Sequence, residues 1–278
     1  MKAALFLLAL AAAGPAAAAP PAAILSSDSG HYLQALEGFA EAWGSTVTIV
    51  SGDAPLPGQA TGFVAFGSKA AAREWPPDAV VVACLSPSVV AVRDDAVTHV
   101  SLLPDPEVLV SRLRLLFPAI TVMRAFWSSD SSRDDVSALV KAGADRGVTV
   151  LSERVAPPSR LPGHLRGLSG RADAVWLMPD PALVTAENFA ILREYAAAEK
   201  LPFIAPTEGL AERGATATIA VSFRDMGRAA AESLRARLTG SGEAEFVRAG
   251  RVTVTVNASA ARLIGLGAKF ESADKVLP

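Results

Sequence analysis

The chain has 278 residues, of which 51% are apolar and 19% charged, and its formal net charge is −2. This length exceeds one typical domain and can bury a large core, so either one very large domain or two lobes would fit. Lys and Arg are interspersed among Asp and Glu and form no basic footprint for nucleic acid. We therefore expect no nucleic-acid partner.

Residues 1–18 have the layout of a secretory signal peptide, with Lys2, an apolar run over residues 3–13 and then small residues. The run is shorter than the ~20 residues that span a bilayer, and no comparable run follows. We expect a soluble periplasmic or secreted protein, cleaved after Ala18. The single Cys, Cys84, lies inside an apolar run, so neither a lipoprotein anchor nor an intramolecular disulfide is expected.

N-terminal sequencing of the exported protein should accordingly begin within a few residues of Ala19, because a charged start, a short apolar core and a small-residue tail occur together. An intact Met1 on exported protein, or a lipid attached to its N-terminus, would contradict this prediction.

Short apolar strands alternate with helices along the first part of the chain. Residues 22–25 predict a strand, and after a polar loop the apolar side chains recur at helical spacing from Tyr32 to Trp43. Further strands, bounded by Gly, Pro and Ser, are predicted at 47–50, 63–66, 79–84 and 98–102. Short buried strands separated by helices indicate a parallel sheet.

The same pattern then starts again. A strand at 120–126 is followed by a polar loop at 128–133 and by a helix that ends at Gly147. A helix over 186–199 has Thr185 as its expected N-cap. Further strands are predicted at 148–151, 174–177 and 203–205. Two successive series of this kind indicate two similar lobes.

After a strand at 217–221, the segment Ser222-Phe-Arg-Asp225 is a variant capping box that opens a helix ending at Gly240. Residues 252–256 are predicted as the final strand. Because these elements follow two complete lobes, they can return to complete earlier sheets. We therefore expect several crossings between the lobes, and hence a hinge.

Pro-Asp-Pro occurs twice after a predicted strand, at residues 104–106 and 179–181. In the first copy Asp105 is expected to cap a helix whose first turn contains Pro. In the second copy Thr185 can cap the following helix instead. Asp180 is therefore expected to be freer to face a cleft.

Nothing in the sequence indicates a metal or a cofactor. His31, His99 and His164 are far apart, and Cys84 belongs to a predicted strand, whereas a metal site needs clustered ligands. The adjacent pairs Asp94-Asp95 and Asp134-Asp135 are expected to be solvated, because neighbouring side chains point apart.

Enzyme motifs are also missing. No Gly-x-Ser-x-Gly nucleophile elbow occurs. Residues 62–69 have the length of a P-loop, but Ser68 separates Gly67 from Lys69, and residues 63–66 should be a buried strand. Gly265-Leu-Gly267 lacks the third Gly of a dinucleotide fingerprint. We expect a protein that is not an enzyme.

An ordered set of short segments resembles the ABC transporter substrate-binding protein family, which includes tryptophan-type binding proteins. The segments span nearly the whole mature chain and are Ile24-Leu-Ser-Ser27 with Tyr32 and Leu36-Glu-Gly-Phe39, Trp176-Leu-Met-Pro-Asp-Pro181, Leu201-Pro-Phe-Ile-Ala205, Gly214-Ala215, Gly227-Arg-Ala-Ala230, and Val256-Asn257 with Ala260-Ala-Arg-Leu-Ile-Gly265. The resemblance implies the type I periplasmic binding protein fold, with two Rossmann-like lobes and three hinge crossings. Lobe one would comprise 22–117 plus 223–250, and lobe two 118–222 plus 251–278.

Ligands of open α/β sheets bind beyond the carboxyl ends of the strands, so the loops that follow strands are candidates for the binding site. Hydroxyls and helix N-termini suit a carboxylate or polar head, and two aromatic side chains could stack on an apolar body. Helix capping is the alternative role for roughly half of these residues. The candidate residues are Ser26, Ser27, Asp28, Tyr32, Gly67, Ser68, Ser86, Pro87, Trp127, Ser128, Asp180, Thr207 and Glu208.

The chain departs from the family where an amino group would be recognised. Family members commonly have a Thr-Asp-Pro-like segment after the fourth strand, whereas this chain has Cys84-Leu-Ser-Pro87. The ligand is therefore expected to be a small molecule, aromatic or more apolar than an amino acid.

Three functions fit these observations. The first is a solute-binding protein that delivers its ligand to an ABC permease in the inner membrane. The second is a ligand-sensing periplasmic subunit that docks on a membrane receptor and would have the same lobes and cleft. A remote third is a periplasmic hydrolase, which should turn over chromogenic esters or glycosides.

Overall fold

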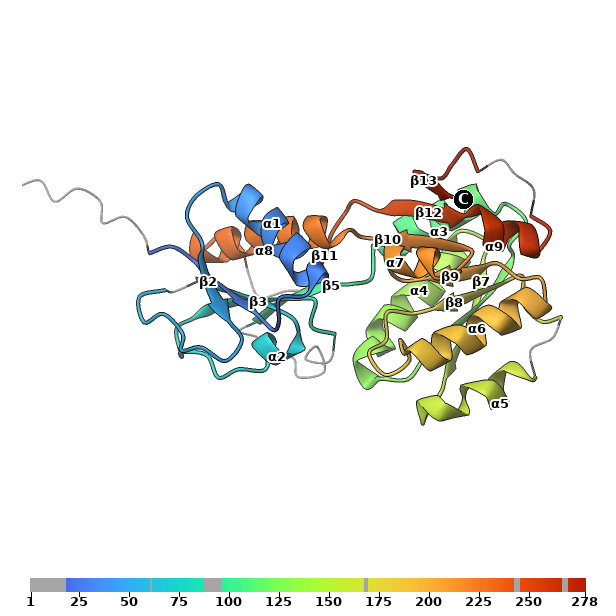
Figure 1. Ribbon diagram of the computed structural model, residues 1–278, viewed down its shortest axis with the longest axis horizontal. Coiled ribbons are helices and arrows are strands. Elements are labelled where there is room, and N and C mark those ends of the chain that lie inside the picture. Colours follow the sequence, from blue (N-terminus) through green and yellow to red (C-terminus); the bar gives the residue numbers. More distant parts are fainter. Residues whose placement is uncertain (1–18, 61, 88–96, 168–169, 243–245, 267–269) are drawn as a thin grey trace, which may run out of the picture.

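The structure is a computed structural model that describes residues 19–60, 62–87, 97–167, 170–242, 246–266 and 270–278. Two α/β lobes lie side by side, each built on a mostly parallel sheet with helices on both faces (Figure 1). The expected fold class is confirmed. Residues 1–18, which include the predicted cleavage site, and the Asp94-Asp95 pair lie outside the described residues.

Lobe one contains a six-stranded sheet in which all described pairings are parallel. The order across the sheet is β11 (Phe246–Arg248), β5 (Val97–Ser101), β4 (Val80–Cys84), β3 (Gly62–Phe66), β1 (Ala22–Leu25) and β2 (Thr48–Ser51). The helices α1 (Gly30–Trp43) and α8 (Phe223–Leu238) cover one face, and the short α2 (Ser68–Ala71) packs on the other. Because β1 and β3 are covered on both faces, all their residues are buried, and their sequences are continuous apolar runs.

Lobe two contains a seven-stranded sheet whose order is β13 (Lys275–Leu277), β12 (Thr253–Asn257), β10 (Ala217–Ala220), β9 (Phe203–Ala205), β8 (Ala174–Leu177), β6 (Val122–Trp127) and β7 (Thr149–Arg154). β12 runs antiparallel to β10, whereas the strands from β10 to β7 are parallel. One face carries α3 (Pro106–Leu116) and α4 (Arg133–Asp145), and the other carries α5 (Leu161–Leu165) and α6 (Ala186–Ala198). Two short helices, α7 (Glu208–Glu212) and α9 (Ala258–Leu263), contact β12.

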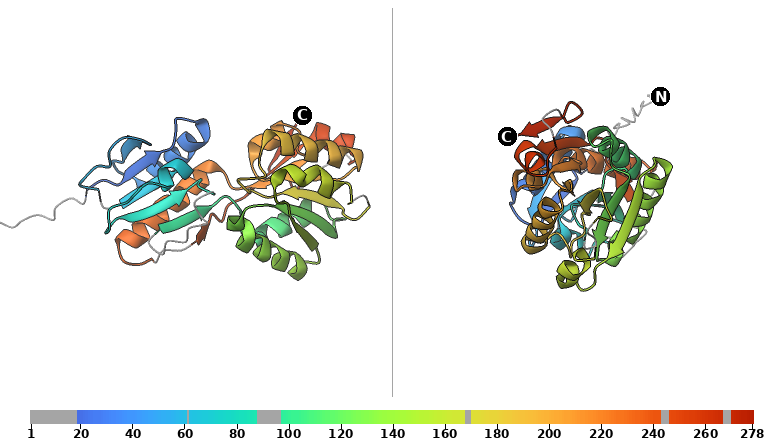
Figure 2. Two further views of the ribbon diagram at one scale, coloured as in Figure 1. Left: turned by 90° about the horizontal axis from the view of Figure 1, so that it is seen from below. Right: turned by 90° about the vertical axis from the view of Figure 1, so that its right-hand side faces the viewer.

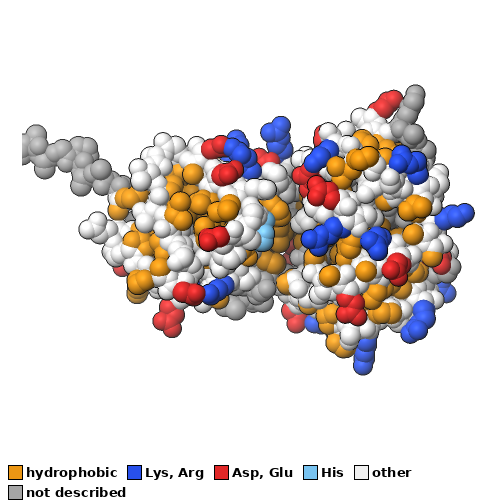
Figure 3. Space-filling view, in the orientation of Figure 1, with side chains coloured by type: hydrophobic (Ala, Val, Ile, Leu, Met, Phe, Trp, Pro, Cys, Tyr) orange, Lys and Arg blue, Asp and Glu red, His pale blue; other side chains and the backbone are white. Residues whose placement is uncertain are grey.

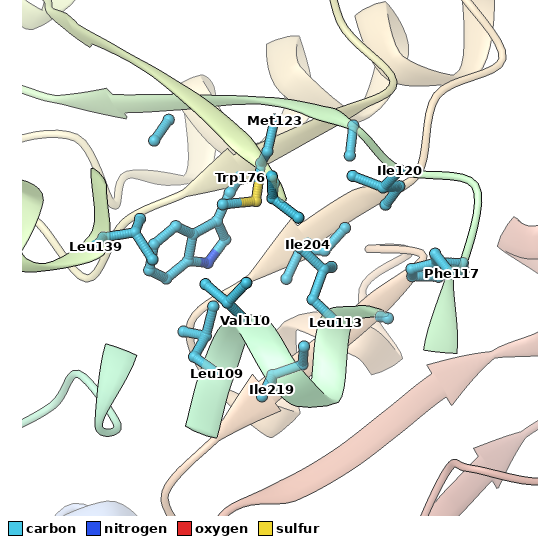
Figure 4. Close-up of a cluster of buried hydrophobic side chains, with 14 of the residues drawn as sticks. Leu109, Val110, Leu113, Phe117, Ile120, Met123, Leu139, Trp176, Ile204 and Ile219 are labelled. Atoms are coloured by element: carbon cyan, nitrogen blue, oxygen red, sulfur yellow. The ribbon is translucent and has the colours of Figure 1, made fainter. Parts of the chain in front are cut away.

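The core of lobe two is centred between α3, α4 and the sheet. Trp176 of β8 is only 1% exposed and lies among Leu109, Val110 and Leu139, which project from the two helices (Figure 4). Buried apolar residues recur at intervals of three or four positions along each helix, as at Leu109 and Leu113 of α3. Each helix therefore has one apolar stripe, which packs on this face of the sheet.

The chain passes between the two sheets at residues 102–105, 221–222 and 249–252. The predicted first boundary, after residue 117, is too late, because α3 buries Leu109, Val110 and Leu113 in the core of lobe two. An apolar helical stripe does not reveal which of two sheets it will cover. In Figure 2 the connecting segments run together between the lobes.

Two strands were not predicted from the sequence. β11 and β13 have three residues each and lie at sheet edges, where their side chains are partly exposed. The strand predicted as the last, at 252–256, corresponds to β12, and β13 follows it. Short edge strands lack the continuous apolar run of a buried strand, so the pattern gave no signal for them.

The predicted helix caps are confirmed. Thr185 accepts a hydrogen bond from the backbone N–H of Asn188, and Ser222 accepts one from that of Asp225. Asp105 accepts hydrogen bonds from the N–H groups of Glu107 and Val108 at the start of α3. Within the described residues, no helix has both the length and the apolar character that crossing a membrane requires.

Candidate ligand-binding cleft

The carboxyl ends of the parallel strands in both sheets face the junction between the lobes. The chain leaves β5 at this junction to enter lobe two, and leaves β10 there to enter lobe one. Because neighbouring strands are parallel, the loops after β1, β3 and β4 lie at the same edge as the end of β5, and those after β6, β8 and β9 lie at the edge of β10. Figure 3 shows a notch where the lobes meet.

Both sheets have the same order, since β2-β1-β3-β4-β5 in lobe one corresponds to β7-β6-β8-β9-β10 in lobe two. The direction of winding reverses between β1 and β3 in the first sheet and between β6 and β8 in the second. Loops that follow such switch points leave a crevice in which α/β proteins bind ligands. The fold thus provides one candidate half-site on each lobe.

In lobe one, Ser26, Tyr32 and Gly67 converge at the switch point. The Ser26 hydroxyl accepts a hydrogen bond from the backbone N–H of Ala70 at 2.9 Å. Gly67 has φ +97°, and a Cβ placed on it would lie 2.5 Å from both the Ser26 Oγ and the Tyr32 hydroxyl oxygen. Only glycine fits here. Gly67, which belongs to the P-loop-like segment 62–69, therefore shapes the floor of the candidate half-site.

The other candidate residues of this half-site are more peripheral. Ser27 and Asp28 are exposed, and Ser68 is half-buried at the start of α2. His31 places its ring against Tyr32, with ring centroids 4.1 Å apart, and near Phe223 at 5.7 Å. Burial lowers the pKa of His31. A small aromatic surface therefore flanks the first turn of α1.

A small cavity lies at the junction and is lined by both lobes. Its volume is about 30 Å³, enough for a water molecule but not for an amino-acid-sized ligand. Ser86 and Pro87 contribute from lobe one, and Ser132, Asp135 and Pro181 from lobe two. Ser86 is buried, directly after Leu85, whose φ is +57°. Ser86 and Pro87, both predicted from the sequence as site residues, thus lie at the lobe interface.

In lobe two, Trp127 ends β6 and is half-buried. The Arg154 guanidinium lies over its ring, 5.3 Å from the centroid, and donates from Nε to the carbonyl oxygen of Ser128 at 3.2 Å. Arg154 also forms an ion pair with Asp130 at 3.1 Å. One face of the indole is therefore covered by a cation, and the buried Ser128 follows it directly in the chain. Arg154, the last residue of β7, was not among the residues predicted from the sequence, because it is neither a hydroxyl nor an aromatic side chain in a loop after a strand.

Asp180 does not face the cleft as expected. Its side chain is fully buried, with 0% exposure. One carboxylate oxygen accepts from the N–H groups of Ser128 and Ser129 and from the Ser132 hydroxyl, at 2.7–2.9 Å. The other oxygen accepts from the Ser129 hydroxyl, Ala182 N–H and Leu183 N–H. A carboxylate with six donors has no capacity left for a ligand, so Asp180 fixes the loop that follows Trp127.

The same hydrogen bonds lower the pKa of Asp180. Burial by itself raises the pKa of this carboxyl, but the hydrogen bonds from Ser128, Ser129 and Ser132 outweigh it and hold the pKa below its usual value. The group is therefore ionised at neutral pH.

The remaining candidates follow β9. Thr207 is at the N-cap position of α7, although its side chain makes no capping hydrogen bond, and Glu208 forms an ion pair with Lys275 at 2.6 Å. Both are half-buried. The cation that pairs with Glu208 is thus Lys275 of β13, a strand that was not predicted from the sequence.

The prediction from the sequence is also wrong for Asp135. Expected to be solvated with Asp134, it is instead largely buried in the first turn of α4, with 14% of its side chain exposed, and pairs with Arg248 at 2.5 Å. Burial raises the pKa of Asp135, and the hydrogen bond from Arg248 opposes this effect. No three His, Cys, Asp or Glu side chains among the described residues gather so that they could hold a metal ion.

A sequence model of the family described as ABC transporter substrate binding protein matches residues 81–270. The chain belongs to this family. Membership confirms the resemblance inferred from the ordered segments and supports a solute-binding role, since this is a family of substrate-binding proteins and not of enzymes. A search of curated proteins gave no match.

Solved structures agree on the fold. A substrate binding protein with adhesive properties from Clostridium difficile, in a ligand-free, open structure, is 16% identical with a TM-score of 0.67, over 93% of this chain and 99% of that one. An ABC domain from Streptococcus pneumonia in complex with L-Trp is also 16% identical, with a TM-score of 0.65 over 94% and 100% of the chains. A conserved domain protein from Vibrio cholerae is 14% identical, with a TM-score of 0.64 over 94% and 100%. At these identities the likeness concerns the two-lobe fold.

Proposed function

We propose that this family member is an exported solute-binding protein that captures a small molecule between its lobes and presents it to an ABC permease in the inner membrane. The observation that carries the proposal is the pair of switch points: loops after β1 and β3 on one lobe face the same junction as loops after β6 and β8 on the other. The family match over residues 81–270 supports the same role.

The chemistry of the half-sites favours a ligand with an aromatic or apolar body and a polar head. Tyr32 and Trp127 supply one aromatic surface on each lobe, and the Ser26 hydroxyl lies beside Tyr32. The ABC domain from Streptococcus pneumonia that was solved in complex with L-Trp has the same fold, which supports an aromatic ligand. Asp180 is saturated and Glu208 is paired, so among the candidate carboxylates the exposed Asp28 is the one available to an ammonium group.

Tyr32→Ala and Trp127→Ala should each weaken binding roughly five-fold or more, because each removes stacking worth about 1 kcal/mol. The residues are about a hundred positions apart in sequence, yet each follows the first strand of its own lobe. Calorimetric titration with aromatic carboxylates and amino acids, L-tryptophan included, measures the effect.

Leu115→Ala is the matched control, because Leu115 is 61% exposed on α3. It should bind as the parent does. Chemical denaturation of each variant separates lost contacts from lost stability. Parental affinity in both aromatic variants would show that these loops do not share a ligand.

The partner needs a separate test. Cross-linking of the exported protein to membranes that contain its cognate permease should yield a complex between the two. Co-purification with a membrane receptor instead would favour the sensor function, which has the same two lobes.

A further inference from the structure

An ion pair joins the two lobes beside the hinge. Arg248 ends β11 at the edge of the lobe-one sheet, and Asp135 lies in the first turn of α4 in lobe two. An Arg248 terminal nitrogen donates to the Asp135 Oδ1 at 2.5 Å. The third passage between the lobes, at residues 249–252, begins directly after Arg248. The contact therefore lies next to a segment about which the lobes can turn.

Both partners are withdrawn from water. The exposed fraction of the side chain is 26% for Arg248 and 14% for Asp135. The Arg248 guanidinium also lies over the Phe246 ring at 5.0 Å, and its Nε is buried without a hydrogen-bond partner among the described residues. Phe246 and Asp135 line the same small cavity at the junction. Leaving either charge unpaired in such a poorly hydrated site costs free energy.

The pair is sensitive to rotation of the lobes, because its members move with different sheets. If the angle between the lobes changes so that Arg248 and Asp135 separate, both charges must be rehydrated or be left unpaired in a partly buried site. The contact thus makes one lobe arrangement more favourable than its neighbours, without touching the aromatic half-sites at Tyr32 and Trp127.

We propose that the Asp135–Arg248 ion pair is a latch that sets the angle between the two lobes. The inference concerns the regulation of the proposed cleft and rests on that function. Its test requires no ligand, so failure of the latch and failure of ligand binding are distinguishable.

Electron-spin distance measurements report the lobe angle. One spin label would be placed at Gln59→Cys in lobe one and one at Ala198→Cys on α6 in lobe two; both positions are exposed. Cys84 is fully buried, and burial raises the pKa of its thiol, so the native cysteine should stay unlabelled. The doubly labelled protein without other changes is the reference.

Asp135→Asn and Arg248→Gln should each shift or broaden the distance distribution. The charge-swapped double variant, Asp135→Arg with Arg248→Asp, should move it back towards the reference. Asp145→Asn is the matched control, since it removes the same charge from an exposed position at the other end of α4, and it should leave the distribution unchanged.

Denaturation midpoints verify that each protein is folded, and Arg248→Gln preserves the test if Asp135→Asn does not fold. The proposal would be overturned if the folded single variants had the same spin-label distance distribution as the reference. A swapped variant that stays as altered as the singles would overturn it too, because the change would then come from lost packing rather than from charge.

Discussion

Replacing Asp180 with Asn should lower the free energy of unfolding by about 3–5 kcal/mol, because buried N–H donors left without an acceptor cost about 1–3 kcal/mol each. The carboxylate accepts hydrogen bonds from Ser128, Ser129, Ser132, Ala182 and Leu183, and its side chain has no exposure. An Asn amide turns one acceptor into a donor that faces other donors. Urea denaturation followed by tryptophan fluorescence measures the loss.

The first Pro-Asp-Pro copy provides the control. Asp105 accepts from only two backbone N–H groups at the start of α3, at 2.8 and 3.2 Å, and is half-buried. Asp105→Asn should therefore cost about 1 kcal/mol or less, as is usual for a helix N-cap. Equal effects at the two positions would refute the structural role of Asp180.

The Asp180 contribution should depend on pH. Because the pKa in the folded protein is depressed, the stabilisation is fully present above the unfolded value of about 3.9 and disappears as the pH falls through the lower folded value. The difference in unfolding free energy between the parent and Asp180→Asn should therefore be constant near neutrality and shrink below about pH 4. A difference that stays constant into strong acid would contradict an ionised Asp180.

The second large effect is expected at Gly227, where α8 crosses α1. A Cβ on Gly227 would lie 1.8 Å from the carbonyl oxygen of Ala35, and one on Gly38 would lie 2.0 Å from that of Arg224. The obstacle is backbone in both cases, so no side-chain rotation can relieve it. Gly227→Ala should cost about 3 kcal/mol or more, or prevent lobe one from folding.

Gly30→Ala, on the partner helix α1, is the control, because a Cβ there would meet nothing within 4 Å. It should be neutral or stabilise the protein by up to about 1 kcal/mol. Thermal unfolding followed by circular dichroism compares the two. Similar midpoints for the two variants would show that the helices are not in such close contact.

Much of the fold could be predicted because its central strands are buried on both faces. β1 and β3 are continuous apolar runs between Gly, Pro and Ser, and the caps at Thr185 and Ser222 are local signals. The three-residue edge strands β11 and β13 carry no such pattern. The assignment of α3 to lobe two depends on which core its apolar stripe meets, which no local pattern records.

The candidate site was less predictable, because it depends on pairings across long distances in sequence. The loops themselves follow from the rule for parallel sheets. What a residue does within a loop depends on its partners. The Asp180 carboxylate accepts hydrogen bonds from residues about 50 positions away, and Asp135 pairs with Arg248 on the other lobe. The convergence of Ser26, Tyr32 and Gly67 likewise appears only when β1 and β3 lie side by side.

Native mass spectrometry of the exported protein, purified without added ligand, tests the central claim most directly. If the lobes capture a small molecule, a fraction of the protein should carry one added mass of a few hundred daltons. That mass should be lost on gentle activation and be diminished in Tyr32→Ala and Trp127→Ala. Protein that carries no added mass, and gains none when supplied with aromatic carboxylates, amino acids or a periplasmic metabolite extract, would contradict the solute-binding account.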